Sequence, residues 1–454
     1  MNQGDLRKAF AKHRINKVKI GGFDVDGVLR GKYIALEKFW PAVESGLGFC
    51  DVVFGWDSND VLYDNVQLTG WHTGYPDALA RIDLDTFRLI PWEPGVAFFL
   101  LDFASIQNQP LEVSPRQLLK KIVGRARAMG FEPMMSTEYE FFIFKEDSHS
   151  VRAKEYKNMI PLSPGMFGYS VSRTGTHAEL ANSLMDSLRD FGIPLEGFHT
   201  ETGPGVYEAA IRYDTALAAA DKSALFKNAV KQFVSRQGLI ATFMAKWNQH
   251  LPGCGGHLHQ SLWDPKLRKN LFSDARKPDG MSSLMKNYMA GQLELMPEIT
   301  ALICPTVNSY KRLVPNTWAP TNVSWGLENR TTALRAIAGP SPKSTRVEYR
   351  LAGADLNPYI AMAASLASGL YGIQKKLVPS APCKQNAYTE PDAVTRPLPR
   401  SLIEATTKLK DSVRLREILG EEFVAHYVAT REWEARQSLA AVTDWELERY
   451  FEII

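Results

Sequence analysis

The segment Gly253–Asp264 places the strongest constraint on how this chain can fold. Its two histidines, His257 and His259, are separated by one residue and follow a run of glycines. In an extended strand both imidazoles would face the same side, about 6.5 Å apart along the chain, and the glycines would let the backbone approach a bound group closely. Imidazole is a frequent metal ligand. The segment therefore predicts a ligand-binding strand, although for an isolated His-x-His two partly buried core histidines are the simpler explanation.

Carboxylates in a second segment favour the ligand-binding interpretation. Glu138 and Glu140 lie within the apolar run Met134–Phe144, and on a strand both would point to one face while Tyr139 points to the other. A carboxylate in apolar surroundings is costly unless it is paired or binds a metal. The alternative, the solvent-facing side of an edge strand, is weakened because Phe141–Phe144 puts apolar side chains on both faces. Metal ligation is the favoured interpretation.

Two further groups of charged residues have the spacing of a binding site. Glu201 and Glu208 flank a glycine-containing turn that could bring both into one site, although acidic loop residues are commonly only solvated. Arg346, Glu348 and Arg350 alternate along a predicted strand and would share one face. That pattern is typical of a surface ion-pair ladder, but it could also hold an anionic substrate beside a metal. Other arginines precede it, at Arg312, Arg330 and Arg335.

Together these residues predict a metal-dependent reaction at phosphate. Five glutamates and one histidine can supply two sites of three protein ligands each, and oxygen-rich ligand sets suit Mg²⁺ or Mn²⁺. Two such ions beside clustered arginines favour phosphoryl transfer from a nucleotide. The chain contains no Gly-x-x-x-x-Gly-Lys-Ser/Thr sequence, so it is not a P-loop enzyme.

The composition excludes several classes of protein. The chain has 454 residues, 45% of them hydrophobic and 23% charged, which is ordinary for a globular protein. A net charge of +3 over this length gives no basic stripe, so we expect no nucleic-acid partner. The cysteines are widely spaced, the N-terminal residues are polar and no long apolar window occurs. These features predict a cytoplasmic protein with reduced thiols and no membrane span.

Hydrophobic periodicity and turn residues predict three units. Residues 1–14 include a short amphipathic helix, residues 15–107 form a small β-rich domain, and residues 108–454 alternate strands and helices. Gly27 is expected to close a hairpin, and Ser114 to cap the helix that follows it. The predicted helices cover 4–13, 115–129, 174–191, 214–237, 401–418 and 420–442, and the predicted strands 17–26, 28–34, 80–84, 87–90, 97–102 and 134–144.

The combination of motifs resembles the glutamine synthetase family. The matching segments occur in the family's order over nearly the whole chain: Ser136–Phe142, Glu201–Glu208, Gly256–Ser261, Asn308–Pro315, Asn329–Arg330, Arg346–Arg350 and Asn357–Tyr359. The resemblance implies an α+β protein, with an N-terminal β-grasp-like domain and a glutamine synthetase/guanido kinase-like catalytic domain on a curved antiparallel sheet. It also implies a homo-oligomer, a hexameric ring or a dodecamer, with active sites between subunits.

The resemblance also implies a reaction and assigns residues to it. ATP would phosphorylate the γ-carboxylate of glutamate, and an amine would then displace phosphate from the acyl phosphate. One metal site would use Glu140, Glu201 and Glu208, and the other Glu138, His257 and Glu348. The residues at the nucleotide phosphates or the phosphorylated intermediate would be His259, Lys343, Arg330, Arg335 and Arg346, with Ser261 also at the nucleotide. Glutamate would be held by Arg312, Arg350 and the backbone near Gly253.

The sequence departs from the family on the amine side of the site. In ammonia-using members a flap glutamate takes a proton from ammonium, and Trp318 replaces it here. The family's Asp-Gly-Ser-Ser loop, whose aspartate helps bind ammonium, is missing, and Asp57 is only a loose positional match that the resemblance offers for this catalytic role. Pro252 stands where the family usually has asparagine. Because the other motifs match, we expect a γ-glutamyl amide ligase whose amine is larger than ammonia.

Trp318 suggests the kind of amine. An indole can stack on an aromatic amine or lie over an alkylammonium ion, and an arylamine needs no deprotonation at pH 7. A weakly basic or aromatic amine is therefore favoured, with alkylamines and polyamines as further options. Trp318 could instead be a packing residue in a remodelled loop.

Two rival interpretations remain. One is an ordinary glutamine synthetase with an altered flap. The other is a non-catalytic, ring-forming structural protein, which the presence of all six ligand positions argues against. Tyr388 lies near the tyrosine that some bacterial members adenylylate, but that position alone predicts no regulation.

Overall fold

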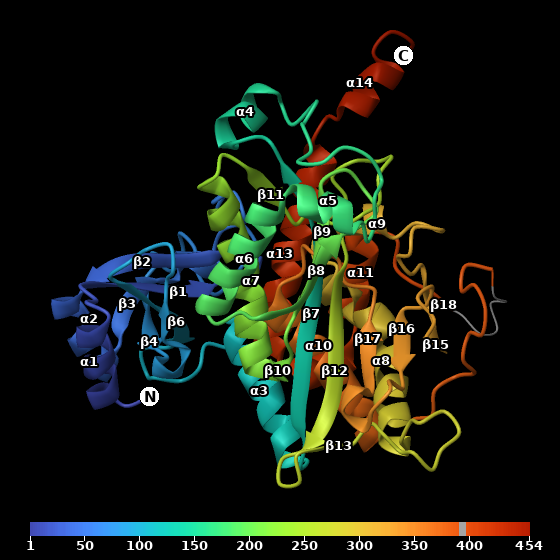
Figure 1. Cartoon of the computed structure of the whole chain (residues 1–454), viewed down its shortest axis with the longest axis horizontal. Coiled ribbons are helices and arrows are strands. Elements are labelled where there is room, and N and C mark those ends of the chain that lie inside the picture. Colours follow the sequence, from blue (N-terminus) through green and yellow to red (C-terminus); the bar gives the residue numbers. More distant parts are fainter. Residues whose placement is uncertain (390–395) are drawn as a thin grey trace.

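The computed structural model describes residues 1–389 and 396–454, and these residues fold around two β-sheets (Figure 1). The smaller sheet is formed by the N-terminal part of the chain, and the larger sheet runs through the middle of the molecule. A two-stranded pair is separate from both and consists of β14 (Asn322–Val323) and β18 (Arg396–Pro397).

The N-terminal sheet is mixed and is covered by two helices. Its elements are α1 (Gln3–Lys12), β1 (Lys17–Phe23), β2 (Leu29–Ala35), α2 (Leu36–Ser45), β3 (Leu47–Cys50), η1 (Asp51–Phe54), β4 (Asp77–Ile82), η2 (Leu84–Thr86), β5 (Arg88–Leu89) and β6 (Val96–Ala104). The strand order is β2-β1-β6-β4-β3, with β5 beside β6. The predicted β1–β2 hairpin is confirmed, with Gly27 in its turn at a φ of 76°. Phe10, Phe39 and Phe99 pack together in the core beneath it.

The larger sheet supplies the strands on which most predicted site residues lie. Its strands are β7 (Glu132–Phe144), β8 (Leu195–Thr200), β9 (Val206–Ile211), β10 (Asp214–Thr215), β11 (Ile240–Thr242), β12 (Gly256–Asp264), β13 (Lys269–Asn270), β15 (Trp325–Leu327), β16 (Leu334–Ile337) and β17 (Arg346–Tyr349). The order is β15-β16-β17-β12-β7-β9-β8. The pairs from β16 to β8 are antiparallel, whereas β15 and β16 are parallel.

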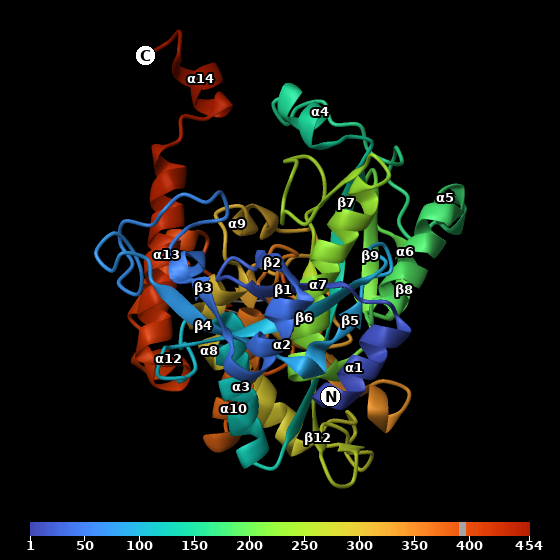
Figure 2. The same ribbon diagram turned by 90° about the vertical axis from the view of Figure 1, so that its left-hand side faces the viewer.

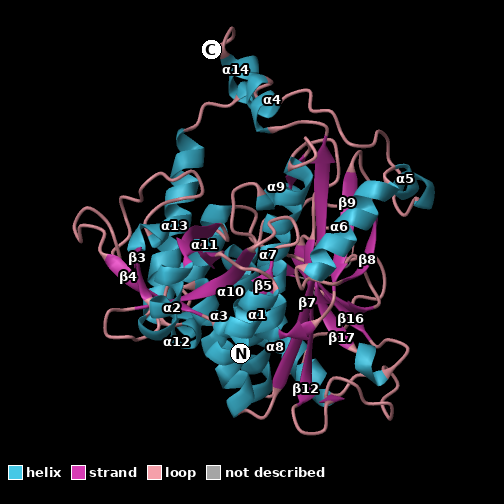
Figure 3. Cartoon of the chain, turned by 60° about the vertical axis from the view of Figure 1, so that its left-hand side comes forward, coloured by secondary structure: helices cyan, strands magenta, loops and turns pink. Residues whose placement is uncertain are grey.

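Helices cover one face of the larger sheet (Figure 3). The main ones are α3 (Pro115–Ala128), α7 (Ala216–Ser235), α8 (Ser283–Ile303) and α10 (Pro358–Gln374). The contact is clear at Tyr139 of β7, whose fully buried ring stacks on Phe226 of α7. Since side chains alternate along a strand, Glu138 and Glu140 must point away from this helical layer. The sheet therefore has one buried face and one face available for a site.

Helix boundaries differ from the predicted ones where a local cap interrupts the periodicity. The predicted helix 174–191 is two helices, α5 (Val171–Thr176) and α6 (Ala178–Asp190), and 401–418 is also two, α11 (Leu402–Lys410) and α12 (Val413–Leu419). Ser412 caps α12 by accepting a hydrogen bond from the backbone N–H of Leu415. Ser114 does occupy the N-cap position of α3, but its side chain makes no capping hydrogen bond.

Six helices of the described residues lie outside the predicted ranges, namely α2, α8, α10 and the short helices α4 (Ser148–Ala153), α9 (Ser309–Arg312) and α14 (Asp444–Tyr450). α14 follows the long helix α13 (Glu421–Ala440) and extends away from the rest of the molecule (Figure 2). Among the residues that the structure describes, no helix combines the length and apolar character needed to cross a lipid bilayer. The domain boundary near residue 107 stays a prediction.

Candidate active site

A cavity of about 1120 Å³ opens on the uncovered face of the larger sheet. Most residues predicted for the site line it: Glu138, Glu140, Glu201, Glu208, Gly253, His257, His259, Trp318, Arg330, Arg335, Arg346, Glu348 and Arg350. The strand register explains why residues so distant in sequence meet here. His257 pairs with Glu138 across β12 and β7, His259 pairs with Glu348 across β12 and β17, and Glu140 pairs with Glu208 across β7 and β9.

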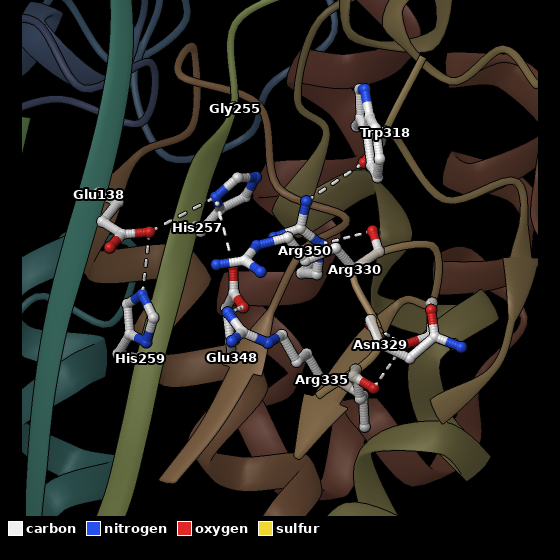
Figure 4. Close-up of polar contacts among 12 residues, drawn as sticks. Glu138, Gly255, His257, His259, Trp318, Asn329, Arg330, Arg335, Glu348 and Arg350 are labelled. Atoms are coloured by element: carbon white, nitrogen blue, oxygen red, sulfur yellow. Dashed lines mark hydrogen bonds and ion pairs between the residues drawn. The ribbon is translucent and has the colours of Figure 1, made fainter. Parts of the chain in front are cut away.

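One ligand-like cluster surrounds Glu138 (Figure 4). Its carboxylate lies 3.2 Å from Nε2 of His259 and 3.8 Å from Nδ1 of His257. The same Nδ1 atom is 3.5 Å from the carboxylate of Glu348. Arg335 forms an ion pair of 3.1 Å with Glu348, and Arg350 contacts that carboxylate as well. Sequence analysis placed His257 with both glutamates, and the geometry brings His259 to Glu138 in addition.

A second cluster contains a histidine that sequence analysis missed. Nε2 of His199 lies 3.2 Å from Glu201 and 3.5 Å from Glu208. Glu140 is outside this cluster and instead accepts a hydrogen bond of 2.7 Å from the backbone N–H of Gly255. His199 stands two residues before Glu201, so the two side chains have the same alternation that singled out His257 and His259. The sequence therefore contained a pattern from which His199 could have been predicted.

Tyr169 was also missed, and its ring stacks on His199 with centroids 4.3 Å apart. Burial and the neighbouring Glu201 raise the pKa of Tyr169 to about 12. It belongs to a glycine-rich loop rather than to a strand, and loops carry no periodic signal from which its position could be predicted.

The carboxylates differ strongly in their affinity for a proton. Burial and the adjacent glutamates raise the pKa of Glu208 to about 9. Burial alone would raise the pKa of Glu348 too, but Arg350 and His257 lower it to about 2. Burial likewise opposes ionisation of Glu138, yet His259 and His257 hold its pKa below the usual range. Such a concentration of carboxylates, with one forced to keep its proton, fits a site that exchanges a proton for a divalent cation.

The donor set suits a hard divalent ion. Ligand atoms lie within 4.8 Å of one another in three groups, which are Glu138–His259–Glu348, Glu138–Glu208–His257 and His199–Glu201–Glu208. Carboxylates combined with few imidazoles favour Mg²⁺ or Mn²⁺ over softer metals. The residues present therefore fit the predicted metals.

Ser261 and Lys343 line a smaller pocket of about 280 Å³. This pocket shares Glu138, His259 and Arg346 with the larger cavity. Two aromatic rings stand at its edge, those of Tyr213 and Trp263, with centroids 6.4 Å apart and planes inclined by 27°. That separation is within the range of a direct aromatic pair, so the two rings give the pocket an aromatic wall on which a planar group can stack.

Arg312 and Asp57 lie outside the cavity lining. Arg312 is buried behind it, where it donates to the carbonyl of Leu351 at 3.0 Å and approaches Nε2 of His257 at 3.5 Å. Asp57 is buried in the N-terminal part and accepts hydrogen bonds from the backbone of Asn59 and from the indole of Trp433 at 3.2 Å. Its carboxylate is therefore already paired within this chain, and its predicted catalytic role stays a prediction.

Trp318 stands at the mouth of the cavity, across from the strand clusters (Figure 4). Its side chain is 66% exposed and its backbone has a φ of 61°. A positive φ is rare for a bulky residue and marks a backbone conformation that its neighbours must hold. Gly253 faces the same cavity, and an added Cβ would lie 2.5 Å from the carbonyl of Ala245, so only glycine fits there.

Comparisons with known proteins agree with this geometry. The family model described as "Glutamine synthetase, catalytic domain" matches residues 112–450. "Type-1 glutamine synthetase 2" of Dictyostelium discoideum is 52% identical over 439 residues, covering 96% of this chain and 84% of that protein. "Glutamate--isopropylamine ligase" of Pseudomonas sp. is 39% identical over 450 residues, covering 99% and 98%. A solved structure described as "GmaS/ADP complex-Conformation 1" superimposes with a TM-score of 0.85 at 27% identity, covering 98% of this chain and 99% of the other.

The protein is thus an ATP-dependent carboxylate–amine ligase by class. The chain belongs to the glutamine synthetase family, and the predicted α+β fold of that family is confirmed. The names of the relatives include both a glutamine synthetase and an isopropylamine ligase. Family membership alone therefore does not specify the amine.

Proposed function

We propose that this protein joins the γ-carboxylate of glutamate to an amine larger than ammonia, through a γ-glutamyl phosphate made from ATP. The main observation in support of the proposal is the position of Trp318. It occupies the cavity mouth, where ammonia-using members have a proton-accepting glutamate. The isopropylamine ligase from Pseudomonas, similar over nearly its whole length, supports an alkylamine as the acceptor.

The smaller pocket would take the nucleotide. The base would stack against the aromatic residues that line this pocket, with Ser261 and Lys343 beside it, and the phosphates would reach the shared residues His259 and Arg346. Nε of Arg346 lies 3.0 Å from Nδ1 of His259. When His259 is neutral and accepts this hydrogen bond, its own proton must be on Nε2, where it faces the Glu138 carboxylate at 3.2 Å and disfavours metal ligation by His259.

Phosphoryl transfer would take place between the arginines and the ligand clusters. Divalent cations, when bound there, neutralise charge on the phosphates and on the transferred group. Arg330, Arg335 and Arg346 would stabilise the charge that develops during transfer, and Arg335 is oriented for this by its ion pairs with Glu328 and Glu348. Glutamate would lie between Arg350 and Gly253, with Arg312 fixing the strand behind it. The six assigned ligands would remain Glu138, Glu140, Glu201, Glu208, His257 and Glu348, with His199 added to the second group.

The amine would approach from the mouth of the cavity. The cavity lining includes several apolar side chains besides the charged clusters, namely Met166, Leu251, Pro252, Val314 and Trp318. Among the described residues that line the cavity, the carboxylates are all on β7, β9 and β17 or at Glu201, so the mouth offers no partner for a second ammonium group. These features favour an alkyl or aryl monoamine over a polyamine.

The family resemblance and the exposed apolar residues at the end of the chain support a proposal about assembly. We infer a homo-oligomer, a hexameric ring or a dodecamer, working in the cytoplasm on small molecules.

An acceptor screen tests the proposed function. Phosphate release would be measured with ATP, Mg²⁺ or Mn²⁺, glutamate and one amine at a time: ammonium, isopropylamine, putrescine or aniline. We expect an alkyl or aryl monoamine to exceed ammonium in kcat/KM by tenfold or more, which is about 1.4 kcal/mol of transition-state binding. If ammonium is the best acceptor, the ordinary glutamine synthetase interpretation is restored. If no amine gives phosphate release and the protein binds no Mn²⁺, the non-catalytic structural protein is favoured.

Trp318→Ala should lower kcat/KM for the preferred amine by about 3- to 30-fold, the range expected for one aromatic contact with a cationic or aromatic group. Trp318→Glu should shift preference toward ammonium. The matched control is Trp71→Ala, because Trp71 is also exposed and does not line the cavity. Equal effects of the Trp318 and Trp71 substitutions on amine preference would contradict a role of Trp318 in acceptor binding.

A further inference from the structure

Trp318 is held in place by hydrogen bonds to the backbone of its loop rather than by contacts of its indole ring. In the described part of the chain, no ring stacking or cation contact involves Trp318, and most of the side chain is exposed. Two consecutive carbonyls at this point accept hydrogen bonds. The carbonyl of Trp318 accepts one from Nη2 of Arg350 at 3.4 Å, and the carbonyl of Ala319 accepts one from the hydroxyl of Tyr388 at 2.9 Å. The direction of the indole therefore depends on these two donors.

Tyr388 belongs to a segment that is hydrogen-bonded to β14 and to the connection between β15 and β16. Nδ2 of Asn322 donates to the carbonyl of Ala387 at 2.7 Å, and the backbone N–H of Ala387 donates to Oγ1 of Thr331 at 3.0 Å. Thr331 directly follows Arg330, which lines the cavity. The Tyr388 hydroxyl thus connects the segment bonded to Thr331, next to Arg330 of the cavity, to the loop that bears Trp318.

The two donors differ in what else they do. Arg350 lines the cavity and also contacts Glu348, so a change there would disturb the proposed glutamate and metal positions. Tyr388 does not line the cavity, and its half-buried hydroxyl contacts the loop backbone at Ala319 and Trp318. The loop also contains two non-glycine residues at positive φ, Asn316 and Trp318, at 62° and 61°. A loop in this conformation needs external bonds to stay in one arrangement.

We propose that Tyr388 is a positioning residue that fixes the Trp318 indole over the acceptor end of the cavity and so sets the choice of amine. The inference rests on the proposed function, since it assumes that Trp318 contacts the amine. Tyr388 acts through the loop backbone and touches neither substrate nor nucleotide.

Tyr388→Phe tests the inference because it removes only the hydroxyl. We expect kcat/KM for the preferred amine relative to ammonium to fall by about three- to tenfold, the factor that one neutral hydrogen bond supplies. The loss should appear in KM for the amine, while KM for ATP and for glutamate stays unchanged. Asn322→Ala loosens the same connection without altering Tyr388 and should shift the preference in the same direction.

A double-mutant comparison separates positioning from general structure. In a Trp318→Ala background, Tyr388→Phe should have no further effect on amine preference, because there is no indole left to position. The matched control is Tyr427→Phe, which removes a similar hydroxyl-to-carbonyl bond (2.8 Å, to Ala301) away from the cavity and should leave the preference unchanged.

The inference is overturned if amine preference survives both Tyr388→Phe and Asn322→Ala, or if Tyr388→Phe has the same effect with and without Trp318. Failure of the proposed function would look different. In that case the unsubstituted protein would already prefer ammonium, before any variant is made.

Discussion

At the scale of single residues, Glu208 determines how the site responds to pH. Burial and nearby glutamates raise its pKa from 4.5 to about 9, so the metal-free folded protein keeps a proton that the unfolded chain releases. This contribution to stability is complete below pH 4.5 and is lost as pH rises toward 9. The lowered pKa values of Glu138 and Glu348 have the opposite effect on stability, and only at acidic pH, since their contribution is lost as the pH falls.

We therefore expect the melting temperature of the metal-free protein to fall between pH 6 and pH 9. Glu208→Gln should flatten this fall and raise the melting temperature at pH 9 by several degrees, because the amide carries no charge to bury. Mn²⁺ should stabilise the unsubstituted protein most at high pH, where it no longer competes with the proton. Thermal denaturation in EDTA and in Mn²⁺ measures both effects, and identical pH profiles for the variant and the parent would refute the assignment.

The alternation of side chains along strands determined how much of the site could be predicted from the sequence. Glu138 and Glu140 lie on one face of their strand, and His257 and His259 lie on one face of theirs, whatever the rest of the chain does. It was therefore predictable that the two members of each pair face the same cavity. Tyr169 was not predictable in this way, because its position depends on a loop whose conformation follows from contacts made only after folding. The catalytic role of Asp57 stays a prediction, since it rests on a loose motif match, and within this chain its carboxylate accepts a hydrogen bond from the Trp433 indole.

At the scale of elements, the crossing of α8 and α10 fixes the layer beneath the site. A Cβ added to Gly291 would lie 2.2 Å from the carbonyl of Ser368, and one added to Gly372 would lie 2.2 Å from the carbonyl of Asn287. Gly291→Ala should therefore destabilise the protein by about 1–3 kcal/mol through overpacking. Gly124→Ala is the matched control, since that helical glycine of α3 has open space around it and should gain about 0.5–1 kcal/mol.

Thermal or denaturant unfolding of these two variants measures the difference directly. A Gly291→Ala protein as stable as the parent would mean that the helices can separate, and that the backbone contact is not needed to support the sheet. The two glycines also show what the sequence does not reveal. Both lie in helices rich in apolar residues, and only their meeting across the crossing makes a Cβ unacceptable.

Helix boundaries at this scale were predictable only in part. The apolar periodicity of 401–418 continues through the break, so it predicts one helix, whereas the cap formed by Ser412 starts a second one. A serine in an amphipathic segment is compatible with a helix interior and with a cap. Which of the two occurs depends on how the flanking helices pack.

At the scale of the whole molecule, buried ion pairs join the N-terminal part to the catalytic part. Arg116 of α3 bonds Asp221 of α7 at 2.9 Å and Asp102 of β6 at 2.7 Å, so one guanidinium contacts both parts. Arg431 of α13 pairs with Asp26, in the turn after β1. Because these groups are buried, removing one partner would leave an unpaired charge, and the two parts are therefore expected to unfold together.

The exposed end of the chain leads to a prediction about assembly. Phe451 and Ile453 are 80% and 83% exposed beyond α14, in a segment that extends from the body (Figure 2). Apolar side chains gathered this way are typical of an interface. Phe451→Glu with Ile453→Glu should reduce the mass of the assembly in mass photometry or light scattering, because a buried unpaired carboxylate opposes association. Leu267→Glu, at an exposed turn between β12 and β13, is the control and should leave the mass unchanged. An unchanged mass in the double variant would show that the segment makes no contact needed for assembly, and the subunit contacts would then have to be sought on the body of the molecule.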